Sequence, residues 1–529
     1  MKSELDSLPE DIESLKEVIY SDRHFIEFQK SRIEHLENQV NLLKARLFGR
    51  KSEKQVVGKD DGQLTLFDEA EEITEETPAK EEKIIVAEHV RKKGGRKPLP
   101  EDLPRIEVIH DLSEEEKICA CGCEMSRIGE DVSEKLDIVP AKVQVIRHIR
   151  YKYACKNCEG VESEEGAVKI AALPPQIIPQ SIATPGLLAY ILTAKFADAL
   201  PFYRQEKQFA RIGVDLTRAT MANWTIRTAE VCRPLIDCLV EEIRSGPLIG
   251  IDETTVQVLQ EPGRSNTSKS YMWVFRGGDP DKPALIYRYH PTRAGDVAAD
   301  FINEYRGYIQ TDGYAGYDGL DYKPGIIHIG CWAHVRRKFT EVIKARQPVK
   351  KGQPQKTGSA EVALSYIGKL YQLESRADRE ELTPEQRREL RQSEATPILH
   401  DFKEWLDKRS QQTPPQGLLG KAINYAREQW NRLTGYVQDG RLRPDNNLVE
   451  NAIRPFVLGR KNWLFSGHPR GADASAAIFS LIETAKANDL EPYHYLRYVF
   501  ERLPLINRPE DYKNLLPRNL APAAINPTT

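Results

Sequence analysis

Three acidic residues of this sequence, Asp252, Asp312 and Glu450, could hold divalent metal ions if the fold brought them together. Carboxylate oxygens are preferred ligands of Mg²⁺, and three carboxylates at one point would repel one another without a cation. Two such ions would activate a water or a 3′-hydroxyl and stabilise the leaving oxygen of a phosphate ester. The trio therefore predicts phosphoryl transfer on nucleic acid with Mg²⁺ or Mn²⁺. Taken singly, each acid has a simpler interpretation, as a strand-end polar residue, an Asp-Gly turn or part of a helix cap.

Glu450 lies in a stretch, residues 443–467, that is predicted to form a helix opening after Pro444. Arg454 follows four residues later and shares its helical face. Cations suited to phosphate, and an aromatic ring that could stack on a displaced base, come next: Arg460, Lys461 and Trp463. The alternative is a capping box in which Glu450 reaches back to the backbone of Asn447.

The elements that must position these acids form a predicted α/β domain. Three strand-like runs separated by Gly, Asp and Pro turns, at 247–259, 271–275 and 284–289, indicate an antiparallel meander. A helix, a strand ending near Asp312, and a further strand and helix follow. This order is that of a ribonuclease-H-like fold, in which the first and fourth strands are neighbours. Asp252 and Asp312 would then meet, and a later helix would bring Glu450 beside them.

The helix after the fifth predicted strand adds two more candidate DNA contacts, His334 and Arg337. Two further pairs lie outside the predicted catalytic domain. Arg96 and Lys97 belong to a basic Gly-containing segment that could enter an A·T-rich minor groove or remain a solvated turn. Arg218 and Arg227 lie on a helix that follows a turn at Gly213 and a cap near Thr217. That pair of helices is either a helix–turn–helix or an ordinary helical hairpin.

Composition bounds the rest of the chain. At 529 residues it is too long for one core, and its net charge of −3 conceals strongly segregated charge. No apolar run reaches bilayer length and no signal peptide is evident, so we expect a cytoplasmic, nucleoid-associated protein without membrane contact. Eight cysteines in that compartment favour thiols or metal ligands over disulfides.

The expected organisation is modular. The N-terminal third is expected to hold a coiled coil (1–50), an acidic linker with the basic segment (51–104) and a zinc-finger module (105–170). Helices that could bind DNA follow (171–246). The catalytic domain is expected in two parts (247–343 and 443–486), separated by a helical insertion (344–442) and followed by a helical tail (487–529).

A heptad repeat over residues 5–47 predicts the coiled coil. One core position is filled by Leu5, Ile12, Ile19, Ile26, Ile33, Val40 and Leu47, and the other by Leu8, Leu15, Asp22, Gln29, Leu36 and Leu43. β-Branched residues at the first position and leucine at the second favour a parallel pair of helices, and hence a homodimer or a higher assembly. An amphipathic helix packed on its own chain is the alternative.

Cysteine spacing predicts a structural zinc ribbon. Cys155 and Cys158 form a regular CxxC pair after a strand-like run, residues 142–154. The first cluster is irregular, because Cys119, Cys121 and Cys123 give CxC or Cx₃C spacing, and two of these three would complete the site. Buried free thiols are the alternative.

Several long motifs resemble the insertion-sequence-66 family of bacterial DDE transposases along nearly the whole chain. These motifs are LLKARLFGRKSEK, GGRKPLP, YKYACKNCEG, IGIDETTV, IQTDGYAGY, CWAHVRRKF, NNLVENAIRPFVLGRKNWLFSG and LIETAKANDLEPYHYLRYVFERLP. The resemblance implies that Asp252, Asp312 and Glu450 are a catalytic triad and that the cysteine module is a zinc finger. It also implies accessory proteins encoded by the same element.

The expected function is therefore that of a DNA transposase. It would bind double-stranded element ends, cut a strand by metal-promoted hydrolysis and join the freed 3′-hydroxyl to target DNA. One alternative is a non-catalytic DNA-binding regulator derived from such an enzyme. Another is a tyrosine recombinase, because His334 and Arg337 match part of that chemistry, and metal dependence would separate it from a transposase.

Overall fold

The computed structural model describes residues 143–154, 168–345 and 358–525, together with some of the residues between 11 and 40. The chain divides into two compact units, Thr74–Leu173 and the remainder, and each is described by itself. Within these described ranges, no helix has the length and apolar character needed to cross a membrane.

In the smaller unit, β1 (Lys152–Ala154) pairs antiparallel with β2 (Val168–Ile170). The strand predicted before the CxxC pair is therefore regular only over its last three residues. The other predicted features of this unit lie outside the described residues: Arg96, Lys97, Cys119, Cys121, Cys123, Cys155 and Cys158.

The larger unit is built on a mixed sheet whose main strands lie in the order β5–β4–β3–β6–β7. The strands are β3 (Leu248–Val258), β4 (Lys269–Gly278), β5 (Pro283–His290), β6 (Gly307–Gln310) and β7 (Ile326–Ile329). The first three pair antiparallel, whereas β3 with β6 and β6 with β7 pair in parallel. A short strand, β8 (Phe465–Ser466), also pairs with β3. The first and fourth strands of the predicted order are thus neighbours, as expected.

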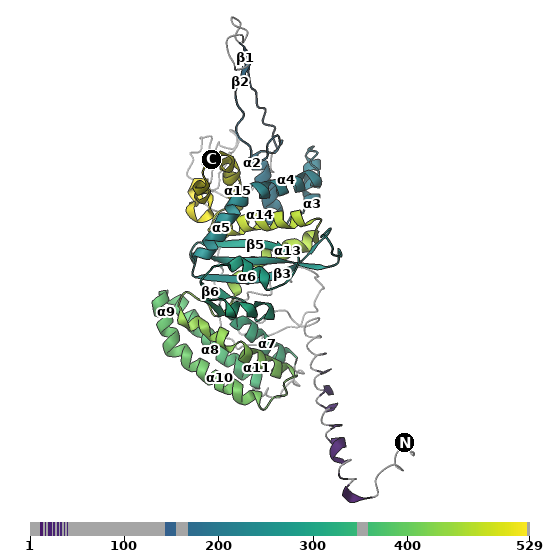
Figure 1. The fold of residues 1–529 in the computed structure, drawn as a ribbon, viewed down its shortest axis with the longest axis vertical. Coiled ribbons are helices and arrows are strands. Elements are labelled where there is room, and N and C mark those ends of the chain that lie inside the picture. Colours follow the sequence, from purple (N-terminus) through teal and green to yellow (C-terminus); the bar gives the residue numbers. More distant parts are fainter. Residues whose placement is uncertain are drawn as a thin grey trace, which may run out of the picture. The chain divides into compact units, whose positions relative to one another are not determined.

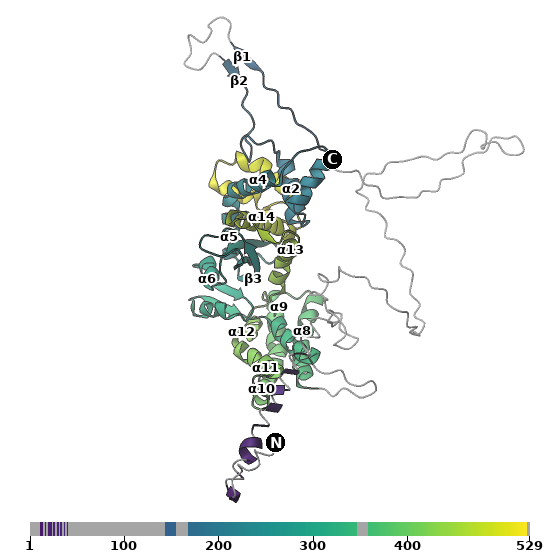
Figure 2. The same ribbon diagram turned by 90° about the vertical axis from the view of Figure 1, so that its right-hand side faces the viewer.

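Helices cover both faces of this sheet. On one face α13 (Asn447–Trp463) contacts β3, and α14 (Pro469–Ala487) contacts β5. On the other face lies α6 (Asp296–Ile302), whose Phe301 ring stacks on Phe275 of β4 with centroids 3.7 Å apart. Figures 1 and 2 show α14 on the side of the sheet toward α2 and α4, with α8, α10 and α11 on the opposite side.

The region before the sheet is helical. Its helices are α2 (Pro185–Phe196), α3 (Phe202–Arg211), α4 (Arg218–Val231) and α5 (Arg233–Ser245), and they share one hydrophobic core with the sheet, α14 and α15 (Pro492–Arg502). Gly213 has a φ of +79°, which suits glycine in the turn between α3 and α4. The Thr217 side chain accepts a hydrogen bond from the Thr220 backbone N–H and caps α4.

A second hydrophobic core lies between β7 and α13 in the sequence. It is formed mainly by α7 (Trp332–Lys344), α8 (Ser359–Arg379), the π-helical turn Arg391–Ala395, α10 (Thr396–Ser410), α11 (Leu418–Glu428), α12 (Trp430–Thr434) and the 3₁₀ turn Gly435–Gln438, and it includes Ile329 of β7. Helix α9 (Pro384–Leu390) lies between α8 and the π-helical turn in the sequence. Trp332 and Phe339 of α7 are fully buried in this core. Leu248 of β3 and Tyr308 of β6 also pack against this core, so these helices pack on the sheet as well as on one another.

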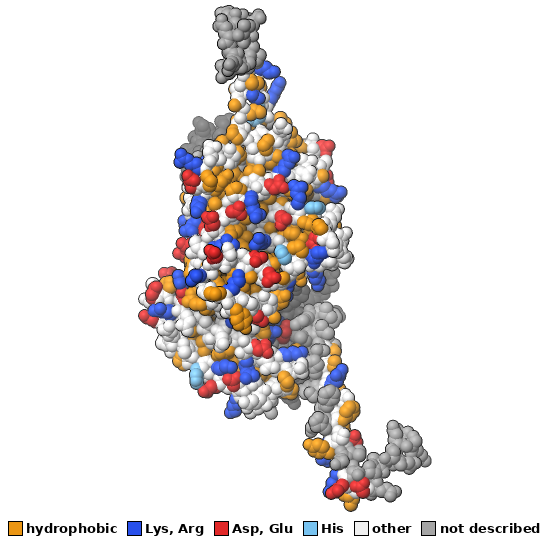
Figure 3. Space-filling model, in the orientation of Figure 1, with side chains coloured by type: hydrophobic (Ala, Val, Ile, Leu, Met, Phe, Trp, Pro, Cys, Tyr) orange, Lys and Arg blue, Asp and Glu red, His pale blue; other side chains and the backbone are white. Residues whose placement is uncertain are grey.

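The described residues from Ile12 to Val40 are helical. Ile12, Ile19, Ile26 and Ile33, which share one heptad position, are each at least half exposed. Figure 3 shows such apolar side chains along the N-terminal segment. A second copy would cover this stripe, and the predicted coiled-coil dimer stays a prediction.

Candidate active site

Asp252 and Asp312 lie on neighbouring elements of the sheet. The parallel strands β3 and β6 pair with Gly250 opposite Gln310, and each aspartate follows two residues later. Asp252 Oδ1 accepts a hydrogen bond from its neighbour's backbone N–H, at Glu253, over 2.9 Å. Asp312 Oδ1 accepts one from the backbone N–H of Tyr314, also over 2.9 Å. One oxygen of each carboxylate is therefore oriented by the main chain.

Glu450 reaches the same place because α13 crosses β3 at Gly250. A Cβ atom at Gly250 would lie 2.3 Å from the Val449 side chain, so this crossing requires glycine. Asn446, just before α13, donates from Nδ2 to the Ile251 carbonyl over 3.0 Å. The first turn of α13, which carries Glu450, is thereby fixed beside the strand that carries Asp252.

Burial and neighbouring acids raise the pKa of both Asp252 and Glu450. Burial raises the pKa of Asp252 well above its usual range, and the negative charges of Glu253, Glu450 and Asp312 raise it further. Burial also raises the pKa of Glu450, Arg337 acts in the opposite direction, and Asp445 and Asp312 add to the increase. Such mutual repulsion arises where carboxylates converge, and a bound cation would relieve it.

Glu450 does not form the alternative capping box. Helix α13 begins at Asn447, and its N-cap, Asn446, makes no side-chain capping hydrogen bond. The Asn447 N–H is instead satisfied by Asp445 Oδ1 over 3.2 Å. Glu450 Oε1 is buried without a hydrogen-bond partner among the described residues. The capping interpretation is therefore wrong here, because the helix starts one position earlier than that motif requires, with Asn446 rather than Asn447 as its N-cap.

His334 and Arg337 of α7 flank Glu450. The His334 Nδ1 atom lies 3.6 Å from Glu450 Oε1, and Arg337 Nη2 lies 3.7 Å from Glu450 Oε2. Burial, and then the positive charge of Arg337, lower the pKa of His334 to about 4. The imidazole is therefore neutral near pH 7, and Arg337 is the cation that faces this carboxylate from α7.

The other predicted cations of α13 are spread along the helix. Arg454 lies close enough to lower the pKa of Glu450, as the shared helical face predicted. Arg460 donates from Nη1 to the side-chain oxygens of Thr254 and Thr255 on β3, over 3.2 and 3.1 Å. Lys461 is exposed in the last turn.

Trp463 differs from its predicted role. Its ring packs against Phe196 and Phe479, with centroids 6.4 and 6.2 Å away, and Lys195 Nζ lies 4.5 Å from the ring centroid. These contacts with α2 and α14 explain the position of the Trp463 ring without a stacked base. The sequence around Trp463 could not reveal them, because one partner helix lies far away along the chain.

Helix α4 presents a mixed surface. Arg218 and Arg227 are exposed, whereas Met221 and Trp224 are buried. The contacts of α4 include α2, α3 and α14. The two arginines are thus available to a phosphate backbone, and this packing is compatible with both a helix–turn–helix and a hairpin.

Glu253 and its partners were not anticipated from the sequence. Because side chains alternate along a strand, Glu253 points to the face opposite Asp252. There its carboxylate accepts hydrogen bonds from the Tyr317 hydroxyl and from Arg293 Nε. The Arg293 guanidinium lies 3.7 Å from the centroid of the Tyr314 ring. The only sequence signal was the acidic neighbour of Asp252 in the motif IGIDETTV.

The helical insertion contacts the loop that carries Asp312. A Cβ atom at Gly313 would lie 2.3 Å from the hydroxyl of Tyr425 on α11. Lys338 of α7 places its ammonium 4.4 Å from the centroid of the same tyrosine ring. The packing of α11 therefore helps to fix the position of Asp312.

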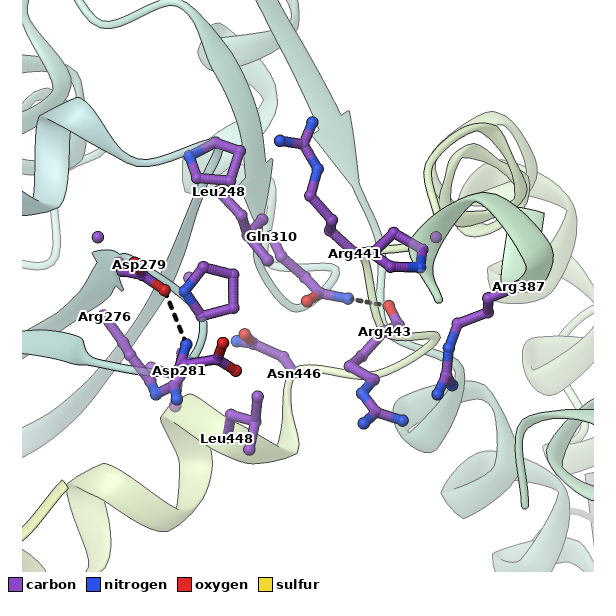
Figure 4. Close-up of a pocket in the computed structure, with 18 of the residues that line it drawn as sticks. Leu248, Arg276, Asp279, Asp281, Gln310, Arg387, Arg441, Arg443, Asn446 and Leu448 are labelled. Atoms are coloured by element: carbon purple, nitrogen blue, oxygen red, sulfur yellow. Dashed lines mark hydrogen bonds between the residues drawn. The ribbon is translucent and has the colours of Figure 1, made fainter. Parts of the chain in front are cut away.

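A cavity of about 460 Å³ lies beside the site, between the sheet and the insertion. Its lining includes Gly250, Gln310 and Asn446, and Figure 4 shows Gln310 donating to the Arg443 carbonyl, over 2.8 Å. The three acids are not among its lining residues. The cavity borders the backbone just before Asp252 and Asp312 rather than the carboxylates themselves.

Comparisons with protein families match most of the chain. Residues 180–474, more than half of the sequence, match the model described as Transposase IS66 family. Residues 116–159 match the zinc-finger binding domain of transposase IS66, and residues 480–517 match the IS66 C-terminal element. Residues 35–108 match a model described as transposase C of IS166 homeodomain. Asp252, Asp312 and Glu450 all fall inside the first match.

Three proteins of Sinorhizobium fredii (strain NBRC 101917 / NGR234) are similar over most of their length. Protein y4jD is 35% identical over 420 residues, which is 77% of this chain and 78% of that protein. Protein y4qI is 31% identical over 514 residues, 93% of this chain and 90% of its own. Protein y4hP is 30% identical over 487 residues, with 88% and 85% covered. All three are named uncharacterized proteins, so they support kinship without an activity. With the family matches along its length, this chain belongs to the IS66 family of DDE transposases.

Proposed function

We propose that this chain cuts DNA strands at the ends of its element and joins each freed 3′-hydroxyl to target DNA. Membership in a DDE transposase family implies polynucleotidyl transfer. The observation that carries the proposal is geometric: Asp252 and Asp312 follow paired residues of adjacent parallel strands, and helix α13, which carries Glu450, crosses the first of these strands. The strand order β5–β4–β3–β6–β7 supports a ribonuclease-H-like assignment, in which such acids meet on adjacent strands.

The carboxylate cluster fits Mg²⁺ or Mn²⁺. Its donors are all oxygens, they are largely withdrawn from water, and Glu450 Oε1 has no hydrogen-bond partner among the described residues. Asp252, Asp312 and Glu450 would be the ligands. When bound, the ions would supply activation of the attacking hydroxyl and stabilisation of the leaving oxygen.

The protein's own contribution is to hold the three carboxylates and the DNA in fixed positions relative to one another. The backbone N–H groups of Glu253 and Tyr314 fix one oxygen of each aspartate, so little reorganisation is needed when the substrate arrives. Arg337 and Arg454 lie beside Glu450 and would bind phosphates on either side of the cut bond. Arg460 and Lys461 would extend this contact along α13, and His334 lines the same edge.

The remaining assignments belong to the same proposal. The zinc finger would hold one Zn²⁺ through Cys155, Cys158 and two of the three earlier cysteines. Arg96, Lys97, Arg218 and Arg227 would grip DNA away from the reacting bond. The N-terminal helices would pair two copies, and accessory proteins of the element would join the assembly on DNA in the cytoplasm.

Two alternatives are less well supported. A non-catalytic regulator would not need Glu450 and Asp312 close enough to raise the pKa of Asp252. A tyrosine recombinase would need a nucleophilic tyrosine rather than this trio, and the chain matches a DDE family instead.

The proposal is tested by a strand-transfer assay with a labelled element end and a supercoiled target plasmid. We expect cleavage and joining with Mg²⁺ or Mn²⁺, and neither reaction in EDTA. Joining that persists in EDTA would support the recombinase alternative. Specific end binding without cleavage in either metal would support the regulator.

A further inference from the structure

Three different donor atoms meet where α7 and α13 begin. The ligand atoms of Cys331, His334 and Glu450 all lie within 4.8 Å of one another. Cys331 is the N-cap of α7, and His334 lies in its first turn. Cys331 Sγ accepts a hydrogen bond from the Asn446 backbone N–H over 3.2 Å, which ties the start of α7 to the start of α13. A sulfur, a nitrogen and an oxygen donor are thus held by two connected helix ends.

Two of these donors are unsatisfied. His334 Nδ1 and Glu450 Oε1 are both buried without a hydrogen-bond partner in the described part of the chain. They face each other at 3.6 Å, which is too long for a hydrogen bond between them. Buried polar atoms in native proteins are nearly always paired, so this gap indicates a ligand. A cation between the two atoms would satisfy both.

The donor set favours a borderline-soft metal over Mg²⁺. Mg²⁺ selects oxygen ligands, whereas a thiolate, an imidazole and a carboxylate are ligands of Zn²⁺. Zinc–ligand bonds of about 2.0–2.3 Å place tetrahedral donors roughly 3.3–3.8 Å apart. Donors within 4.8 Å of one another would therefore need to close by about 1 Å. Binding would release the thiol proton to solvent.

We propose that Cys331, His334 and Glu450 form a zinc site that competes with the catalytic centre for Glu450. The inhibitory consequence rests on the proposed role of Glu450 as the third catalytic acid, whereas zinc binding itself does not. Zinc held by Cys331 and His334 would draw Glu450 away from Asp252 and Asp312. Because the zinc finger would already be filled, further Zn²⁺ would occupy this site, and strand cleavage would fall as free Zn²⁺ rises.

The test compares the full-length protein with its Cys331→Ser variant. Serine keeps a hydrogen-bond acceptor for the Asn446 N–H but is a poor zinc ligand. In zinc titrations, C331S is expected to bind about one equivalent fewer than the wild type. Cys158→Ser is the matched control, because it should remove the zinc-finger equivalent and leave the new site. Equal stoichiometry in wild type and C331S would overturn the proposal.

Inhibition gives a second readout. With each protein normalised to its own rate in Mg²⁺ without added zinc, C331S should need about tenfold more Zn²⁺ for half inhibition. Identical zinc sensitivity in both proteins would contradict the competition. If C331S fails to fold, His334→Gln should lose the same equivalent of zinc whatever its activity. If no protein transfers strands in Mg²⁺, the proposed function fails, while the stoichiometry still decides the zinc site.

Discussion

The Glu450→Gln variant is expected to lose strand cleavage and strand transfer by about 10⁴-fold, while it still binds element ends. Glutamine keeps the size and hydrogen-bonding capacity of the side chain but removes the charge that would help to hold a metal ion. Because Glu450 Oε1 has no hydrogen-bond partner among the described residues, the substitution breaks no structural contact of that atom. Labelled-end cleavage gels measure the loss, and mobility-shift assays with the same DNA measure binding.

The companion variants sharpen this prediction. Asp252→Asn and Asp312→Asn should show the same separation of binding from chemistry, and the losses should not add in double variants. Glu510→Gln, at an exposed acid, is the matched control and should retain activity. An E450Q protein that joins ends at nearly the wild-type rate would refute the assignment of Glu450 as the third catalytic acid. If all three variants did so, the recombinase alternative would move ahead.

Glu374→Gln is expected to destabilise the helical insertion by about 3–5 kcal/mol. Arg391, fully buried, donates from Nε and Nη2 to the Glu374 carboxylate, over 2.7 Å each. Arg387 donates to it as well, over 3.0 Å. Removing the carboxylate charge would leave the buried Arg391 guanidinium poorly compensated, whereas Arg387 keeps its ion pair with Asp378 over 2.6 Å. Urea unfolding monitored by tryptophan fluorescence, with hydrogen exchange over residues 359–442, measures the effect.

The chain offers a matched control for this buried network. Glu394 pairs with Arg376 at the surface, where their side chains are 46% and 36% exposed. Glu394→Gln should therefore cost less than about 1 kcal/mol. Arg391 also donates to the carbonyls of Tyr436 and Leu442, in the segment that leads into α13. Equal destabilisation by Glu374→Gln and Glu394→Gln would show that the buried ion pairs contribute no more to stability than the surface pair.

The arrangement of the acids followed largely from sequence patterns. Short β-rich runs between Gly, Asp and Pro turns predicted β4 and β5, because period and turn chemistry are local properties. Their order then made β3 and β6 neighbours, and the pairing of Gly250 with Gln310 agrees. Asp312 and Glu450 both raise the pKa of Asp252, and their joint role as a catalytic trio stays a prediction.

Contacts between segments far apart in the sequence could not be predicted from local sequence patterns. Trp463 looked like an exposed platform because its own segment is basic, yet Phe196 and Phe479 surround it. The contact of Tyr425 with Gly313 depends on how the insertion packs, which no local pattern encodes. The zinc ligands and the basic segment lie outside the described residues, and they stay predictions.

The central claim is that Asp252, Asp312 and Glu450 together bind divalent metal. Mn²⁺ binding to the zinc-loaded protein, followed by electron paramagnetic resonance or calorimetry, tests it without relying on activity. We predict Mn²⁺ binding by the wild type, an affinity at least about tenfold weaker in each single variant, and no binding at this site when all three acids are replaced by their amides. A triple variant that binds Mn²⁺ as the wild type does would contradict the account.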